Sequence, residues 1–131
     1  MKGPPSTLSV MTQAHALNSA EANAVTSYAE EVGALDLYDQ YGKLLARIAL
    51  AGDHHSLAID LAHVVPQLLA YPCRAVILMH SHPSGRAEPS ESDFLATRAF
   101  AGLLRLLGIA LHDHLILGGE TRFSFRAAGL L

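Results

Sequence analysis

The stretch AVILMHSHPSG at residues 75–85 decides the fold of this chain. Its first five residues are apolar, which is typical of a strand buried on both faces at the centre of a sheet. His80 and His82 follow directly, and because side chains alternate along a strand, they point to the same side. Their Cα atoms are expected roughly 6.5–7 Å apart. Two imidazoles at that spacing can share one metal ion at about 2.0–2.1 Å each.

A second motif, PSESD at residues 89–93, supplies a candidate third ligand. Ser90, with Asp93 three residues later, has the pattern of a capping box, so a helix is predicted to begin here. Side chains in the first turn of a helix lean back toward its N-terminus. The Asp93 carboxylate is therefore expected to return toward the end of the preceding strand. Each motif is common by itself, and together they predict a metal site made of His80, His82 and Asp93.

The order of these residues resembles the signature of the JAMM (MPN+) metalloproteases: His-x-His, then Ser after a gap of seven residues, then Asp three further on. The flanking H-P-S-G and P-S-x-x-D are similar to the RadC-like branch of that family. LHDHLILG at 111–118 and FSFRAAGLL at 123–131 also resemble this branch, so the resemblance extends over roughly residues 30–131. It implies one zinc ion with a bound water and hydrolysis of an amide, peptide or isopeptide bond.

The resemblance also implies roles for residues outside the three ligands. The family carries a glutamate just before the first strand, which implies Glu31 as the catalytic base, with Glu30 as the competing candidate. Without the resemblance, such a glutamate is typical of a solvated strand end, and a slip of one residue would turn it to the opposite face. Ser90 is implied as the donor to the developing oxyanion. Pro83, Ser84 and Gly85 are implied to shape the loop beside the metal.

Two other histidine groups need an interpretation. His112-Asp113-His114 repeats the H-x-H spacing, but it lies within a predicted strand without a nearby helix cap to supply an acid. A partly buried strand histidine with its own hydrogen bonds is the simpler interpretation. The resemblance implies that Asp113 and His114 are family residues. They are expected to have a structural role or to contact the ligands, and not to bind the metal. The adjacent His54 and His55 are typical of exposed loop side chains.

Around this centre, the pattern predicts an α/β fold with one central mixed sheet flanked by helices. This is the MPN, or cytidine-deaminase-like, arrangement that the resemblance implies. One or two helical segments are predicted within residues 14–30. Turn residues are predicted to connect the strands of two hairpins. Pro66 is expected to kink or split one helix, and Gly108 is expected to end another. The predicted strands are 32–38, 43–50, 74–82, 109–117 and 121–125, and the predicted helices are 60–70 and 91–107.

The composition indicates one domain over residues 1–131, with a loose leader over about 1–13. Half of the residues are hydrophobic, which is enough to fill a core. The net charge is −3 and the basic residues are scattered, so this chain alone is not expected to bind nucleic acid. The expected partner is a peptide or protein substrate. Many RadC-type proteins carry an N-terminal helix-hairpin-helix module, and we expect none within the roughly 30 residues before Glu31.

The sequence also indicates a compartment. No run approaches the ~18 apolar residues of a membrane helix, and the N-terminal residues lack the apolar region of a signal peptide. Cys73 is the single cysteine, so neither a disulfide framework nor a cysteine-based zinc site is expected. We therefore expect a cytoplasmic protein that does not associate with membranes.

Three functions compete at this point. The full set of Glu31, His80, His82, Ser90 and Asp93 favours a zinc-dependent hydrolase. A non-catalytic MPN interaction module is the second possibility, although such members usually lack some of the ligands. The third is an accessory role in DNA repair or mobile-element biology, which is the traditional description of RadC-type proteins.

Overall fold

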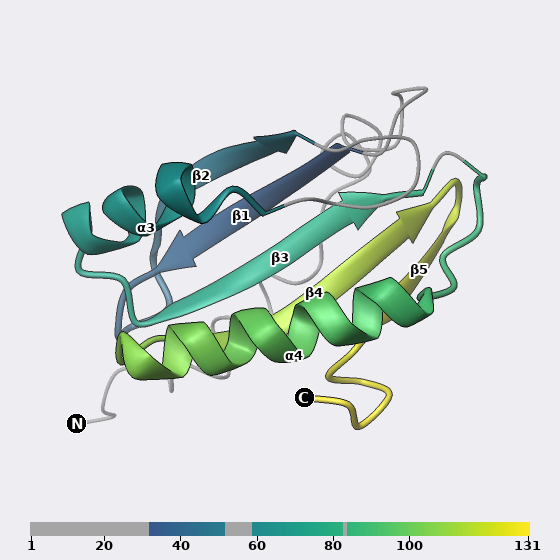
Figure 1. Ribbon diagram of the computed structural model, residues 1–131. Helices are drawn as coiled ribbons and strands as arrows, with labels where there is room; N and C mark the ends of the chain where they lie inside the picture. Colours follow the sequence, from purple (N-terminus) through teal and green to yellow (C-terminus); the bar gives the residue numbers. More distant parts are fainter. Residues whose placement is uncertain (1–31, 52–58, 83) are drawn as a thin grey trace, which may run out of the picture.

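The structure is a computed structural model that describes residues 32–51, 59–82 and 84–131. Five strands and two helices lie within these ranges (Figure 1). Glu30, Glu31, Pro83, the histidines at 54 and 55 and the helices predicted within 14–30 lie outside them. The elements are β1 (Val32–Tyr38), β2 (Leu44–Ala51), α3 (Leu61–Ala70), β3 (Ala75–Ser81), α4 (Glu91–Leu106), β4 (Ala110–Gly118) and β5 (Thr121–Ser124).

The strands form one mixed sheet in the order β2-β1-β3-β4-β5, which confirms the predicted α/β class. β1 is antiparallel to both β2 and β3, whereas β3 and β4 run parallel with α4 as the connection between them. β5 returns antiparallel to β4. All seven residues of β3 are buried, as expected for the strand at the middle of the sheet. The sheet therefore places the end of β3, with its histidines, between β1 and β4.

Both described helices pack on the same face of the sheet (Figure 1). The prediction had placed them on the faces of the sheet without assigning a side. Their buried side chains join those of β1, β2, β3 and β4 in one hydrophobic cluster, whereas the opposite face carries a second, smaller cluster. The larger cluster includes Leu35, Leu37, Ile48, Leu50, Val64, Leu68, Val76, Leu78, Phe100, Leu104 and Leu111. His80 lies on this helix-covered face because it follows Leu78 by two residues along β3, and His114 lies there because it pairs with Leu78.

Of the kink or split predicted at Pro66, the split is wrong, since α3 runs unbroken from Leu61 to Ala70. A proline inside a helix removes one backbone hydrogen bond, here the bond to the Ala62 carbonyl. Both Pro66 and Ala62 are exposed, so water can bind that carbonyl instead. The helix begins at Asp60, whose carboxylate accepts a hydrogen bond from the Ala62 N–H. None of the helices in the described part of the chain is long and apolar enough to cross a bilayer.

The capping box predicted for α4 is confirmed. The Ser90 hydroxyl accepts a hydrogen bond from the Asp93 N–H at 3.1 Å, and the Asp93 carboxylate accepts one from the Ser90 N–H at 2.7 Å. The predicted stop is also found, because Gly108 follows the helix with φ +74°. These two hydrogen bonds fix the orientation of the Asp93 side chain in the first turn of α4.

A bulge in β4 sets which of its side chains face the helices. Val76 pairs with Leu111, but Ile77 pairs with Asp113, so that His112 is an extra residue in the ladder. Beyond the bulge, His114 pairs with Leu78 and shares its face. Without the extra residue, alternation would turn His114 away from the helices and Asp113 toward them.

Candidate metal centre

Three side chains converge at the C-terminal end of β3. His80 Nε2 lies 3.1 Å from His82 Nε2 and 3.4 Å from Asp93 Oδ1, and His82 Nε2 lies 3.2 Å from Asp93 Oδ2. In a tetrahedral zinc site with ligand distances of about 2.0–2.1 Å, neighbouring ligand atoms lie about 3.3 Å apart. The observed separations match that spacing. The three residues are therefore positioned to bind one metal ion.

Each ligand comes from a separate feature of the fold. His80 is on β3 and fully buried, His82 follows the end of that strand, and Asp93 is in the first turn of α4. A pocket of about 220 Å³ opens beside them and is lined by Ile59, Leu78, His80, Ser92, Asp93, Ala96 and His114. A larger pocket of about 680 Å³ lies between α4 and the C-terminal segment, but none of the three ligands lines it. The smaller pocket is therefore the relevant one for chemistry at the metal.

The loop after β3 fixes the His82 ring. Its Nδ1 lies 3.0 Å from the Arg86 carbonyl oxygen, which can only accept a hydrogen bond. Nδ1 must therefore carry the proton, and Nε2 presents its lone pair toward His80 and Asp93. Within the same loop, the Gly85 N–H donates to the His82 carbonyl and the Arg86 N–H donates to the Ser84 hydroxyl.

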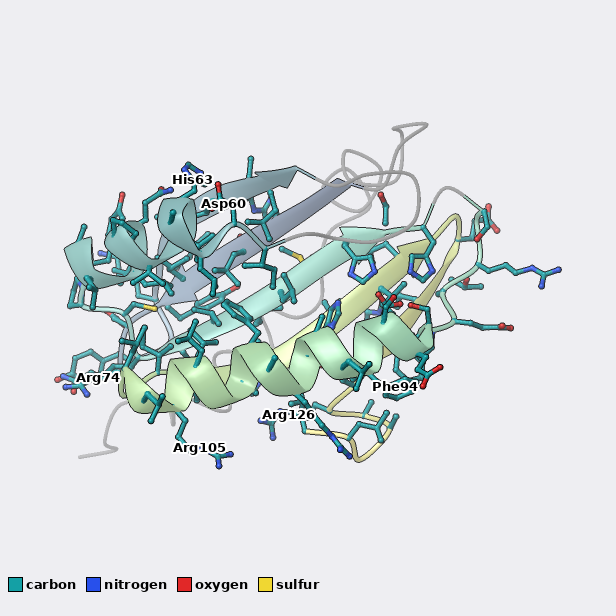
Figure 2. The ribbon with its side chains drawn as sticks, viewed as in Figure 1. Asp60, His63, Arg74, Phe94, Arg105 and Arg126 are labelled. Atoms are coloured by element: carbon teal, nitrogen blue, oxygen red, sulfur yellow. The ribbon has the colours of Figure 1, made fainter. Side chains whose placement is uncertain are left out.

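The buried His80 ring contacts a second histidine. His80 Nδ1 lies 2.7 Å from His114 Nε2, and His114 Nδ1 lies 2.6 Å from the hydroxyl of Thr97 on α4. The His114 ring stacks on Phe125, with centroids 4.7 Å apart and planes tilted by 7°. Figure 2 shows Phe94 near the N-terminal end of α4, and its ring meets Phe125 edge-on. The His114 ring, which contacts His80, is thus held between the sheet and α4.

Burial shapes the electrostatics of this cluster. Desolvation, reinforced by the neighbouring His80 charge, lowers the pKa of His114 from 6.5 to about 3. Burial by itself would raise the pKa of Asp93, but hydrogen bonds from His80 and from the Ser90 N–H outweigh it and hold that pKa below its ordinary value of 3.8. At neutral pH the cluster therefore combines an ionised carboxylate with a neutral His114.

This shift predicts a pH-dependent stability in the metal-free protein. Because the unfolded chain protonates His114 at a higher pH than the folded chain does, the stability contributed by the neutral ring is present above pH 6.5. It is lost as the pH falls from 6.5 toward about 3. NMR of the folded protein should show that the His114 ring does not titrate near pH 6.5. A ring that protonates there would contradict the prediction.

Asp113 lies away from the three ligands, on the opposite face of the sheet from His80. Its carboxylate accepts hydrogen bonds from the His114 N–H, the Ser124 hydroxyl and the Arg126 N–H. These contacts join β4 to β5 and to the C-terminal segment. Its hydrogen bond to the His114 N–H links Asp113 to the site.

Gly118 has a steric role that the sequence analysis did not identify. A Cβ at this position would lie 2.4 Å from both the Ala87 nitrogen and the Arg86 carbonyl carbon. The loop that holds His82 therefore passes directly over the end of β4, and only glycine leaves room for it. The glycine is part of the L-x-D-H-x-I-x-G run, which was a signal that the position mattered.

Gly118→Ala is expected to push this loop away from β4 and to tilt the His82 ring. We expect metal affinity to fall about 10-fold or more and the free energy of unfolding to fall by about 1–3 kcal/mol. Zinc titration and urea unfolding measure the two effects. Gly102→Ala is the matched control, because a Cβ there meets nothing within 4 Å. Unchanged zinc affinity in Gly118→Ala would show that the loop contact does not hold His82.

Thr97 was also not identified from the sequence. It lies four residues after Asp93, on the same face of α4, and its side chain is 3% exposed. A polar residue one turn beyond a ligand was the available signal.

Comparison with known proteins agrees with this geometry. The sequence profile of the RadC-like JAB domain matches residues 9–130. The chain belongs to this family. The five-stranded mixed sheet with two helices is consistent with a JAB/MPN-type domain, and many members of the wider JAB domain family are metalloenzymes.

Relatives of this RadC-like JAB domain carry the names of uncharacterised proteins. UPF0758 protein YfjY of Escherichia coli (strain K12) is 39% identical over 71% of this chain and 59% of its own length. UPF0758 protein PSHAa2643 of Pseudoalteromonas translucida (strain TAC 125) is 38% identical over 78% of this chain and 46% of its own length. UPF0758 protein YeeS of E. coli (strain K12) is 35% identical over 78% and 69%. The chain therefore spans about half to two thirds of these relatives.

Proposed function

We propose that this RadC-like JAB domain is a zinc-dependent hydrolase of the JAMM type, which cleaves an amide, peptide or isopeptide bond in a peptide or protein substrate. One observation carries the proposal. The Nε2 atoms of His80 and His82 lie 3.1 Å apart, and the two carboxylate oxygens of Asp93 lie 3.4 Å and 3.2 Å from them, close to the spacing of neighbouring corners of a tetrahedral site.

The ligand set favours zinc with catalytic capacity. Two imidazoles and one carboxylate suit zinc, and three protein ligands leave one position for water or substrate, as in catalytic rather than structural sites. When bound, zinc supplies Lewis acidity and lowers the pKa of a coordinated water from 15.7 toward about 7. The 220 Å³ pocket beside the ligands gives a substrate carbonyl access to this position.

Glu31 is the proposed general base. It precedes β1 directly, and Gly33, two residues later, pairs with His80 on β3. Strand alternation predicts residue 31 on the same side as Gly33, and this prediction supports the assignment of Glu31 over Glu30. The carboxylate would take the proton of the attacking water and pass it to the leaving amine. Such proton transfer contributes about 10²–10⁴ in rate.

Ser90 is the proposed donor to the oxyanion. Its hydroxyl accepts the Asp93 N–H as part of the helix cap, which leaves its own proton available to donate. The Asp93 carboxylate and the Ser92 hydroxyl, which lies 2.9 Å away, are the alternative partners for that proton. An oxyanion donor of this kind contributes about 10²–10³ in rate.

The proposal is tested by metal analysis and by turnover. Purified protein supplied with zinc should retain one ion per chain and should cleave members of a peptide and isopeptide library. Glu31→Gln should retain zinc but lose turnover by about 10²–10⁴, whereas the matched control Glu30→Gln should keep both. The opposite result would make Glu30 the base. A wild-type protein that retains no divalent metal would overturn the proposal.

The other two functions are separate outcomes of the same work. Zinc retained without turnover on any library member would favour a non-catalytic MPN module. Retention of duplex DNA at low salt, lost as salt is raised, would favour a role in DNA repair or mobile-element biology.

A further inference from the structure

We propose that Thr97 is a positioning residue, which acts through His114 to hold His80 in the one tautomer that can bind the metal. The inference rests on the proposed metal site and deepens it, because it identifies a residue that touches neither metal nor substrate. A chain of three short contacts from α4 to β3 carries it.

The chain begins at a backbone carbonyl of α4. The Thr97 hydroxyl lies 2.6 Å from the carbonyl oxygen of Asp93, one helical turn before it. A carbonyl oxygen can only accept, so the threonine must donate its single proton there. This bond from a threonine to the carbonyl four residues earlier is a common arrangement in helices. The Thr97 oxygen can then act only as an acceptor toward any other partner.

The second contact fixes the tautomer of His114. Its Nδ1 lies 2.6 Å from the Thr97 oxygen, so Nδ1 must supply the proton for that hydrogen bond. A neutral imidazole carries one N–H, and therefore Nε2 of His114 presents a lone pair. That lone pair faces His80 Nδ1 at 2.7 Å.

The third contact fixes the tautomer of His80. Its Nδ1 must donate to His114, so in the neutral ring that metal binding requires, Nε2 carries the lone pair. Nε2 is the atom that faces His82 and Asp93 at 3.1 and 3.4 Å. His80 thus reaches the same state as His82, whose Nδ1 donates to the Arg86 carbonyl. Both rings present Nε2 lone pairs to one point.

The reverse direction of these three hydrogen bonds shows why Thr97 matters. If the Thr97 hydroxyl turned toward His114, each proton would shift by one position, and Nε2 of His80 would carry a proton where the metal binds. Thr97 and His114 are 3% and 2% exposed, so bulk water has little access to substitute for either partner. Asp93 therefore contributes twice: its carboxylate is a ligand, and its carbonyl orients the threonine.

The first experiment reads the tautomers directly in the metal-free wild-type protein. Long-range ¹H–¹⁵N correlation spectra distinguish a protonated ring nitrogen from an unprotonated one. We expect Nδ1 to be protonated in His80, His82 and His114, and Nε2 of His114 to be unprotonated. An unprotonated Nδ1 in His80, or a proton on Nε2 of His114, would overturn the inference without bearing on whether the protein hydrolyses peptides.

The second experiment measures zinc affinity by competition with a chromophoric chelator. Thr97→Val keeps the shape but removes the hydroxyl, and we expect about 10–100-fold weaker binding together with mixed tautomers of His114. Thr97→Ser should restore affinity and tautomers, because serine keeps the hydroxyl. Thr121→Val is the matched control, since that hydroxyl also donates to a carbonyl, Gly118, but contacts no ligand.

The outcomes separate the two proposals. Thr97→Val with wild-type affinity and a single His114 tautomer would show that Thr97 does not position the ligands. Wild-type protein with the expected tautomers but no zinc binding would instead overturn the proposed function. Circular dichroism of each variant shows that a loss of affinity is not a loss of fold.

Discussion

Asp93→Asn is expected to abolish zinc binding and, with it, any hydrolysis. The carboxylate is the only anionic ligand among the three described, and its Oδ1 and Oδ2 face His80 and His82 at 3.4 and 3.2 Å. Loss of a residue that merely supports a ligand costs about 10–100-fold in metal affinity, so loss of the ligand charge itself should cost more than ~100-fold. Elemental analysis and zinc competition measure the effect.

The substitution tests the effect on metal binding separately from any effect on folding. Asparagine can still accept the Ser90 N–H through its amide oxygen, so the cap of α4 should persist and the protein should stay folded. Asp60→Asn is the matched control: Asp60, the N-cap of α3, also accepts a backbone N–H at the start of a helix, that of Ala62, but is not one of the three ligands. The control should bind zinc as the wild type does. Zinc bound by Asp93→Asn with unchanged affinity would remove Asp93 from the metal site.

Asp113→Ala is expected to lower the free energy of unfolding by about 3–5 kcal/mol, because each buried donor left without an acceptor costs about 1–3 kcal/mol. The carboxylate is fully buried and accepts from the His114 N–H, the Ser124 hydroxyl and the Arg126 N–H. The latter two donors are partly buried, so water recovers part of the loss. Urea unfolding measures the change.

The matched control for Asp113→Ala is Asp39→Ala. Asp39 also accepts two backbone N–H bonds, from Tyr41 and Lys43, but these lie in the exposed turn between β1 and β2. Water can replace its carboxylate there, so the control should cost only about 0.5–1.5 kcal/mol. Equal losses in the two variants would mean that burial does not set the cost at Asp113.

Much of the fold follows from local patterns in the sequence. The apolar run before His80 predicted a central strand, and the structure places β3 in the middle of the sheet because its side chains are covered on both faces. Turn residues set the strand ends to within about one or two residues, the ordinary uncertainty of such boundaries. The capping box and Gly108 predicted both ends of α4, because these signals act through the backbone of the helix itself.

Other features depend on contacts between distant segments. Pro66 predicted a kink or a split, and the helix is not split because its exposed side tolerates a missing hydrogen bond. The bulge at His112 has no local signal, since strand pairing between β3 and β4 creates it. The predicted base, Glu31, lies outside the described residues and stays a prediction.

The amino-acid order by itself determined the candidate ligands. Strand alternation places His80 and His82 on one side. The capping box at the start of the next helix directs the Asp93 side chain toward them. Both effects operate within 14 residues of the chain. The contacts of His114 and Thr97 that hold His80 in place depend on the tertiary structure. His114 faces His80 because a bulge shifts β4 by one residue, and Thr97 meets His114 because α4 crosses the sheet at that point. Such contacts join positions 17 and 34 residues apart, and no local preference of the backbone encodes them.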